Sequence, residues 1–193
     1  MPLPKAFVIF FALLACGVIT YVVAHNNLYP IAIVNLRFIT AHTMEKDFRA
    51  ANRYFYNVLL TYGQKTDPNV LEQETSQKEI RRAALEKLII DILIYKEAQH
   101  RIGNTLNTLT DEMIRKNIDL ATISQAAEKL YGLTIEEFKS EILDSEARRE
   151  ILQNTMSTQK EDYNAWLKNA KRQAKVIILL PGFKWDGEKV VAH

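Results

Sequence analysis

The chain has 193 residues, which is enough for one domain with a substantial core. Its 25 basic and 23 acidic residues leave a formal charge of +2, so no strong positive field favours the binding of nucleic acid. A single cysteine excludes an intramolecular disulfide, and the Cys/His spacing of zinc sites does not occur.

The N-terminal segment is the first distinctive feature of the chain. Residues 6–24, AFVIFFALLACGVITYVVA, carry no charge, and at about 1.5 Å per residue a helix of this length nearly spans a hydrocarbon core of about 30 Å. Lys5 precedes the stretch and the next Lys or Arg is Arg37, so the positive-inside rule places residues 1–5 in the cytoplasm. The sequence therefore predicts a cytoplasmic stub (1–5), a transmembrane anchor (6–24) and an extracytoplasmic domain (25–193) of a single-pass protein in the cytoplasmic membrane, with the domain periplasmic or extracellular.

Two other interpretations of this segment stay open. Val22 and Ala24 suit the −3 and −1 positions of a signal-peptide cleavage site, although the apolar run exceeds the usual length of about 7–15 residues. Leu13-Leu14-Ala15-Cys16 resembles the lipobox of a bacterial lipoprotein, but the following residues stay apolar where a polar tether is usual. All three interpretations place the domain outside the cytoplasm.

Two short apolar runs predict strands at opposite ends of the domain. Residues 31–34, IAIV, are mostly β-branched, and residues 176–180, VIILL, are followed by Pro181-Gly182. Because a lone strand is not stable in water, we expect the two runs to pair in a small two-stranded sheet that joins the N- and C-terminal ends of the domain.

The chain between these strands has a helical pattern. Apolar residues recur at steps of three and four in the first helix: Met44, Phe48, Ala51, Phe55, Val58, Leu59 and Tyr62. Gly63 is expected to end this helix, and residues 64–73 to form a loop. A capping box at Ser76 and Glu79 is expected to open a helix to about Ile102. Its middle, residues 88–95, is apolar nearly all round, which predicts a central element.

Further helices are expected towards the C-terminus, so the predicted fold class is mainly α. The expected elements are a helix over about 111–117 capped by Thr108 or Thr110, a helical piece over 120–131 ending at Gly132, a helix from a Thr134–Glu137 capping box to about Asn154, and, after a break near 155–158, a last helix from a Thr158–Glu161 capping box to about Gln173.

The order of these elements resembles the N-terminal chaperone domain of SurA and related parvulin-type proteins of the PpiD and PrsA kind. The family begins with Val-Asn-Gly followed by an Ile-Thr that opens the first helix; here Val34-Asn35 and Ile39-Thr40 match, while Leu36 replaces the Gly. The helix over 85–102, the helix start LTIEEF over 133–138 and the tail over 176–185 extend the resemblance to residues 31–185.

The resemblance implies a mainly helical SurA-N-like domain that binds unfolded or newly exported polypeptides without ATP. Relatives usually carry a parvulin isomerase domain before the final helix, but here only residues 155–160 occupy that place. We therefore expect a membrane-anchored, chaperone-like domain that is not an enzyme. The alternative is a structural or adaptor subunit of a membrane protein complex, for which the same helices form a docking platform.

No residue pattern predicts catalysis or a cofactor. The four histidines lack ligand spacing, and the Thr134–Glu137 capping box already explains a pair of adjacent acids, Glu136 and Glu137. No phosphate loop, nucleophile motif or metal motif occurs, so we expect no catalytic, cofactor or metal site and no small-molecule substrate. The candidate client-binding residues are apolar side chains that the predicted core does not use: Tyr54, Tyr56, Leu60, Phe183 and Trp185.

Overall fold

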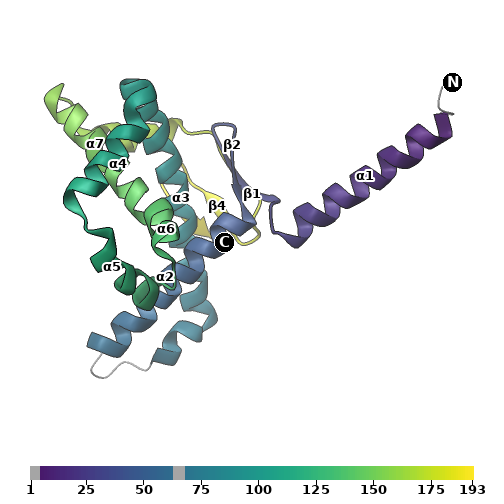
Figure 1. Cartoon of the computed structure of the whole chain (residues 1–193), viewed down its shortest axis with the longest axis horizontal. Coiled ribbons are helices and arrows are strands. Elements are labelled where there is room, and N and C mark those ends of the chain that lie inside the picture. The colour runs from purple at the N-terminus through teal and green to yellow at the C-terminus, as the bar shows by residue number, and fades with distance from the viewer. Residues whose placement is uncertain (1–4, 63–67) are drawn as a thin grey trace.

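The computed structural model describes residues 5–62 and 68–193, and it is mainly helical (Figure 1). Its α-helices are α1 (Lys5–His25), α2 (Ala41–Tyr62), α3 (Glu74–Ile102), α4 (Leu106–Asn117), α5 (Leu120–Ala126), α6 (Ile135–Phe138), α7 (Asp144–Thr158) and α8 (Tyr163–Gln173). Its strands are β1 (Pro30–Val34), β2 (Arg37–Thr40), β3 (Val176–Ile178), β4 (Phe183–Trp185) and β5 (Val190–Ala192). Four short helical segments complete it: the 3₁₀ turns η1 (Pro68–Glu72) and η2 (Gly103–Thr105), and the π-helical turns η3 (Ala127–Tyr131) and η4 (Lys139–Leu143).

The predicted pairing of the two ends of the domain is confirmed. Strand β1 lies between β2 and β3 and is antiparallel to both, with Val34 opposite Val176 and Ala32 opposite Ile178. The sheet has three strands rather than the expected two, and β4 and β5 form a second antiparallel pair. The small sheets therefore contain more of the chain than the apolar runs alone indicated.

The extra strand β2 exists because residues 35 and 36 form a tight hairpin turn. Asn35 has φ 48° and Leu36 has φ 71°, the two positive φ angles that a type I′ turn requires. The backbone N–H of Asn35 donates to the carbonyl of Lys175 (3.0 Å), and its side-chain oxygen accepts from the N–H of Lys175 (3.0 Å). The turn thus also holds the beginning of the C-terminal strand.

Helix α3 is the central element, as its nearly all-round apolar middle predicted. Leu85 and Ile89 are fully buried and belong to one cluster with Ala32 and Val34 of β1. Farther along α3, Ile94 and Ala98 form a second cluster with Leu106 of α4 and with residues of α7. The same helix therefore packs against the sheet at one end and against the later helices at the other (Figure 1).

Three helix boundaries match the predicted signals closely. Gly103, with φ 71°, follows the last residue of α3, and Gly132 takes the left-handed conformation after η3. The capping box before α6 is complete: the hydroxyl of Thr134 accepts from the N–H of Glu137 (3.2 Å), and the Glu137 carboxylate accepts from the N–H of Thr134 (3.0 Å).

The other predicted caps are wrong. Helix α3 already begins at Glu74, so Ser76 lies inside it, and α4 begins at Leu106. The buried Thr110 hydroxyl donates to the Leu106 carbonyl, four residues earlier in α4. It therefore bonds within the helix and does not cap its N-terminus. The expected end of the first helix at Gly63 and the first part of the loop, residues 64–67, lie outside the described residues.

The predicted break near residues 155–158 lies a few residues later in the chain, at residues 159–162. Helix α7 continues to Thr158, and residues 159–162 turn the chain into α8. The N-cap of α8 is Asp162, whose carboxylate accepts from the N–H groups of Asn164 (2.7 Å) and Ala165 (3.2 Å). An aspartate one residue beyond the expected Thr158–Glu161 box therefore provides the cap.

Helix α1 projects away from the other elements in Figure 1, and many of its apolar side chains are exposed. No helix in the described part of the chain is both sufficiently long and sufficiently apolar to span a bilayer. The predicted transmembrane anchor over residues 6–24, and with it the predicted single-pass localisation in the cytoplasmic membrane, is therefore wrong.

Candidate functional site

An apolar cleft opens between α2, α3 and the segment from η3 to η4. It encloses about 360 Å³. Its walls are largely alanine, aromatic and aliphatic, and four charged side chains also line it. The lining residues are Lys46, Asp47, Ala50, Ala51, Tyr54, Phe55, Ile80, Ala83, Ala84, Lys87, Tyr131, Leu133, Glu141 and Ile142.

Aromatic side chains form the rim of this cleft. Tyr54 of α2 stacks on Tyr131 of η3, with ring centroids 5.0 Å apart and planes 12° apart. Tyr131 also contacts Phe138, at a centroid distance of 5.1 Å. Phe55 lines the cleft and is 46% exposed, so its predicted place in the core stripe of the first helix is wrong. The rim therefore presents large apolar surfaces to solvent.

The backbone around Tyr131 explains how the rim is held. The side-chain amide of Asn57 donates to the carbonyls of Lys129 (3.0 Å) and Leu130 (3.1 Å), which binds the end of η3 to α2. Gly132 then reverses the chain with φ 72°. Because η3 and η4 are π-helical turns, they shift the register of the side chains that follow, as π-bulges at functional sites often do.

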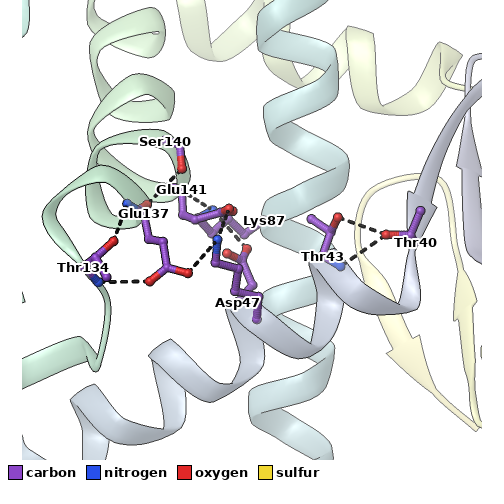
Figure 2. A network of polar contacts seen from close by, with 9 residues as sticks. Thr40, Thr43, Asp47, Lys87, Thr134, Glu137, Ser140 and Glu141 are labelled. Carbon is purple, nitrogen blue, oxygen red and sulfur yellow. Dashed lines mark hydrogen bonds and ion pairs between the residues drawn. The ribbon is translucent and has the colours of Figure 1, made fainter. Parts of the chain in front are cut away.

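Charged residues from α2, α3 and η4 line the cleft and form a network of polar contacts (Figure 2). The ammonium of Lys87 on α3 lies 3.1 Å from the carboxylate of Asp47 on α2 and 3.1 Å from that of Asp91, and it donates to the Glu141 carbonyl (3.3 Å). Lys46 lies 3.0 Å from the carboxylate of Glu141. These contacts connect α2, α3 and η4, and so fix three of the elements that form the cleft.

Burial changes the proton affinities in this network. Asp47 is only 7% exposed, and burial raises the pKa of its carboxyl group although Lys87 opposes the shift. Burial lowers the pKa of the Lys87 ammonium, but Asp91 and Asp47 outweigh it, so the pKa is raised overall. The 3.1 Å contact between Asp47 and Lys87 favours the charged form of both groups and offsets part of the cost of burying the carboxylate.

The predicted client-binding residues fall into three groups. Tyr54 lines the cleft. Tyr56 and Leu60 are 45% and 58% exposed on α2 but do not line the cleft. Phe183 is buried and Trp185 half-buried in the cluster around α3, so these two are corrected from surface candidates to core residues.

Sequence reasoning missed Phe55 and Tyr131 as members of this site. Phe55 fits the apolar stripe by spacing, but α3 does not cover that part of α2. The available signal for Tyr131 was its place directly before Gly132, where a left-handed residue turns the chain. The described residues also contain no group of three or more His, Cys, Asp or Glu side chains that could hold a metal ion.

Comparison with known proteins adds no relative. No protein-family model matches the chain, and no curated protein or solved structure shows significant similarity to it. The SurA-like resemblance therefore stays a prediction that rests on the residues quoted above.

Proposed function

We propose that the protein binds unfolded polypeptides through the apolar cleft and acts as an ATP-independent chaperone. The observation that carries this proposal is the open, aromatic-rimmed cleft of about 360 Å³ between α2, α3 and the η3–η4 segment. Ligand sites are typically apolar hollows of about 300–1,000 Å³, so this one suits one or two side chains of a client. The SurA-like order of elements supports the same function.

The size of the cleft is consistent with reversible binding. Fully burying one large apolar side chain contributes about 1.5–3 kcal/mol, and immobilising the client opposes part of that gain. One such contact gives weak affinity, which a chaperone needs in order to release its client. We therefore expect suppression of aggregation at near-stoichiometric amounts of the protein rather than at catalytic amounts.

The test is to fill the cleft without disturbing the core. Ala83 lines the cleft and is exposed, so Ala83→Phe places a ring in the cleft from α3. The matched control is Ala165→Phe at an exposed alanine of α8 that does not line the cleft. Light scattering of a chemically unfolded client should show that Ala83→Phe loses most of the protection, whereas Ala165→Phe and the wild type keep it.

Thermal unfolding of the same proteins separates binding from folding. We expect both variants to melt within a few degrees of the wild type, because neither position is buried. Equal protection by Ala83→Phe and the wild type would show that the cleft is not the binding site. Absence of protection by the wild type against several unrelated clients would contradict the chaperone function itself.

A structural or adaptor subunit of a protein complex is the second candidate. A different observation favours it: on the outer face of the three-stranded sheet, Phe38 and Ile177 lie on either side of Ile33 and are 65% and 57% exposed. Such a row suits a flat contact with one folded partner. A single folded protein that co-purifies at a fixed ratio, together with no protection of unfolded clients, would favour this function.

A further inference from the structure

A basic groove adjoins the apolar cleft on the other side of a shared wall. It encloses about 450 Å³, and Lys46, Ala50, Tyr131 and Leu133 line both hollows. The remaining lining residues of the groove are His42, Arg49, Arg53, Gly132 and Glu137. A ligand that lies in the cleft can therefore reach the groove by passing over a single wall of side chains.

The positive charge of the groove comes from one face of α2. His42, Lys46, Arg49 and Arg53 are spaced by four, three and four residues, which places them on the same side of the helix. Lys46 is neutralised by Glu137 (3.3 Å) and Glu141 (3.0 Å). Within the described part of the chain, no carboxylate forms an ion pair with either arginine, so Arg49 and Arg53 leave the groove positive.

Gly132 holds Arg53 at the groove. A Cβ atom on Gly132 would lie 2.6 Å from Nη1 and 2.8 Å from Cδ of Arg53, so the arginine side chain lies directly against the glycine backbone. Gly132 is itself fixed by its positive φ and by the bonds of Asn57 to the carbonyls just before it. The Arg53 side chain is exposed, but it is thus placed against Gly132, next to Tyr131 of the aromatic rim.

We propose that the preferred occupant is a polypeptide segment in which an acidic side chain follows closely on a large apolar one. This inference rests on the proposed function. The apolar side chain enters the cleft, and the carboxylate of the neighbouring Asp or Glu binds Arg49 and Arg53 in the groove. Charge complementarity carries the assignment, because a guanidinium and a carboxylate match in shape as well as charge.

The test uses fluorescent, unstructured peptides that contain one Phe and differ only by Glu or Gln beside it, with amidated C-termini. Exposed ion pairs each contribute modestly, so anisotropy titrations of the full-length protein should show about three- to tenfold tighter binding of the Glu peptide. The double variant Arg49→Gln/Arg53→Gln should bind both peptides equally. The control Lys116→Gln/Lys168→Gln removes two exposed lysines elsewhere and should keep the preference.

Each outcome decides one question. Equal binding of both peptides by the wild type overturns this inference and leaves the proposed function standing, whereas binding of neither overturns the proposed function. A Gln peptide with a free C-terminal carboxylate that binds more tightly than the amidated Glu peptide overturns the assignment to an acidic side chain. A preference that persists at about 1 M salt, where the Debye length is about 3 Å, also contradicts it. Loss of all binding in the arginine variant, with its melting temperature unchanged, shows that the arginines do not act through the peptide carboxylate alone and overturns the proposal as well.

Discussion

At the scale of single residues, Leu36 is the most unusual position in the described chain. It has φ 71° and its side chain is 90% exposed, so it bears a backbone strain that no burial of its side chain offsets. The left-handed conformation costs an ordinary L-residue about 1–2 kcal/mol, and glycine is the residue that a type I′ hairpin turn favours. The SurA-like pattern has Gly at this place.

We therefore predict that Leu36→Gly stabilises the protein. The relief of strain exceeds the extra entropy that glycine has in the unfolded chain, so the gain should be about 0.5–1 kcal/mol, or roughly 2 °C in melting temperature. Circular dichroism during heating measures it. The control Leu36→Ala removes the exposed side chain but keeps the Cβ atom, so it should bring no gain. Equal melting temperatures for the two variants would show that backbone strain is not the cause.

At the scale of elements, the sequence predicted what depends on local chemistry. The β-branched runs identified β1 and β3, and the nearly all-round apolar stretch identified α3 as central. Strand β2 was missed because Asn35-Leu36 lacks the glycine that announces a hairpin. The cleft was missed because it needs the π-helical turns η3 and η4 to face α2, and no spacing rule announces a π turn.

The charge network is an interaction between elements that the sequence did not predict. Asp47, Lys87 and Asp91 come from two helices, and nothing in either helix indicates that they meet. Once α2 and α3 pack, Asp47 is nearly buried and needs the ammonium of Lys87 beside it. The network is therefore a consequence of packing, and it also connects elements that form the cleft.

We predict that Lys87→Met destabilises the protein by about 2 kcal/mol at neutral pH, because it leaves a buried carboxylate without its cation. The control is Lys96→Met, at an exposed lysine of the same helix for which the described residues supply no ion-pair partner; its effect should stay within about 0.5 kcal/mol. Urea unfolding of both variants gives the two free energies. Equal losses would show that the contact with Asp47 does not stabilise the fold.

The pH dependence of this difference has a definite sign. Burial already raises the pKa of Asp47 in the folded protein, and loss of the lysine raises it further. A carboxyl group whose folded pKa lies above its unfolded value takes up a proton on folding. The free-energy cost of burying this group therefore shrinks as the pH falls through the folded pKa towards the unfolded pKa of about 3.9. The gap between Lys87→Met and the wild type should therefore narrow between pH 7 and pH 4.5. A gap that widens on acidification would contradict this assignment.

At the scale of the whole molecule, the C-terminal tail closes the fold onto its beginning. Strand β3 pairs with β1 from the other end of the chain, and the buried side chains of Phe183 and Val190 belong to the same cluster as Val34 of β1 and Leu85 of α3. Arg82 on α3 donates to the carbonyl of Val190 (3.2 Å). The tail is therefore part of the main core, and its loss should be felt by the helices as well as by the sheet.

The last prediction tests this closure with a pair of substitutions in the tail. Phe183→Ala removes a side chain that is 7% exposed, and it should cost about 3–5 kcal/mol, since it leaves a cavity beside α3. Ile177→Ala lies in the adjoining strand but is 57% exposed, so it should cost less than about 1 kcal/mol. If the tail and the helices unfold together, far-ultraviolet circular dichroism, which reports the helices, and tryptophan fluorescence, to which Trp185 of the tail contributes, should give coincident transitions at a lowered temperature. A fluorescence change that precedes the loss of helix would mean that the tail melts separately and that the helical core stands without it.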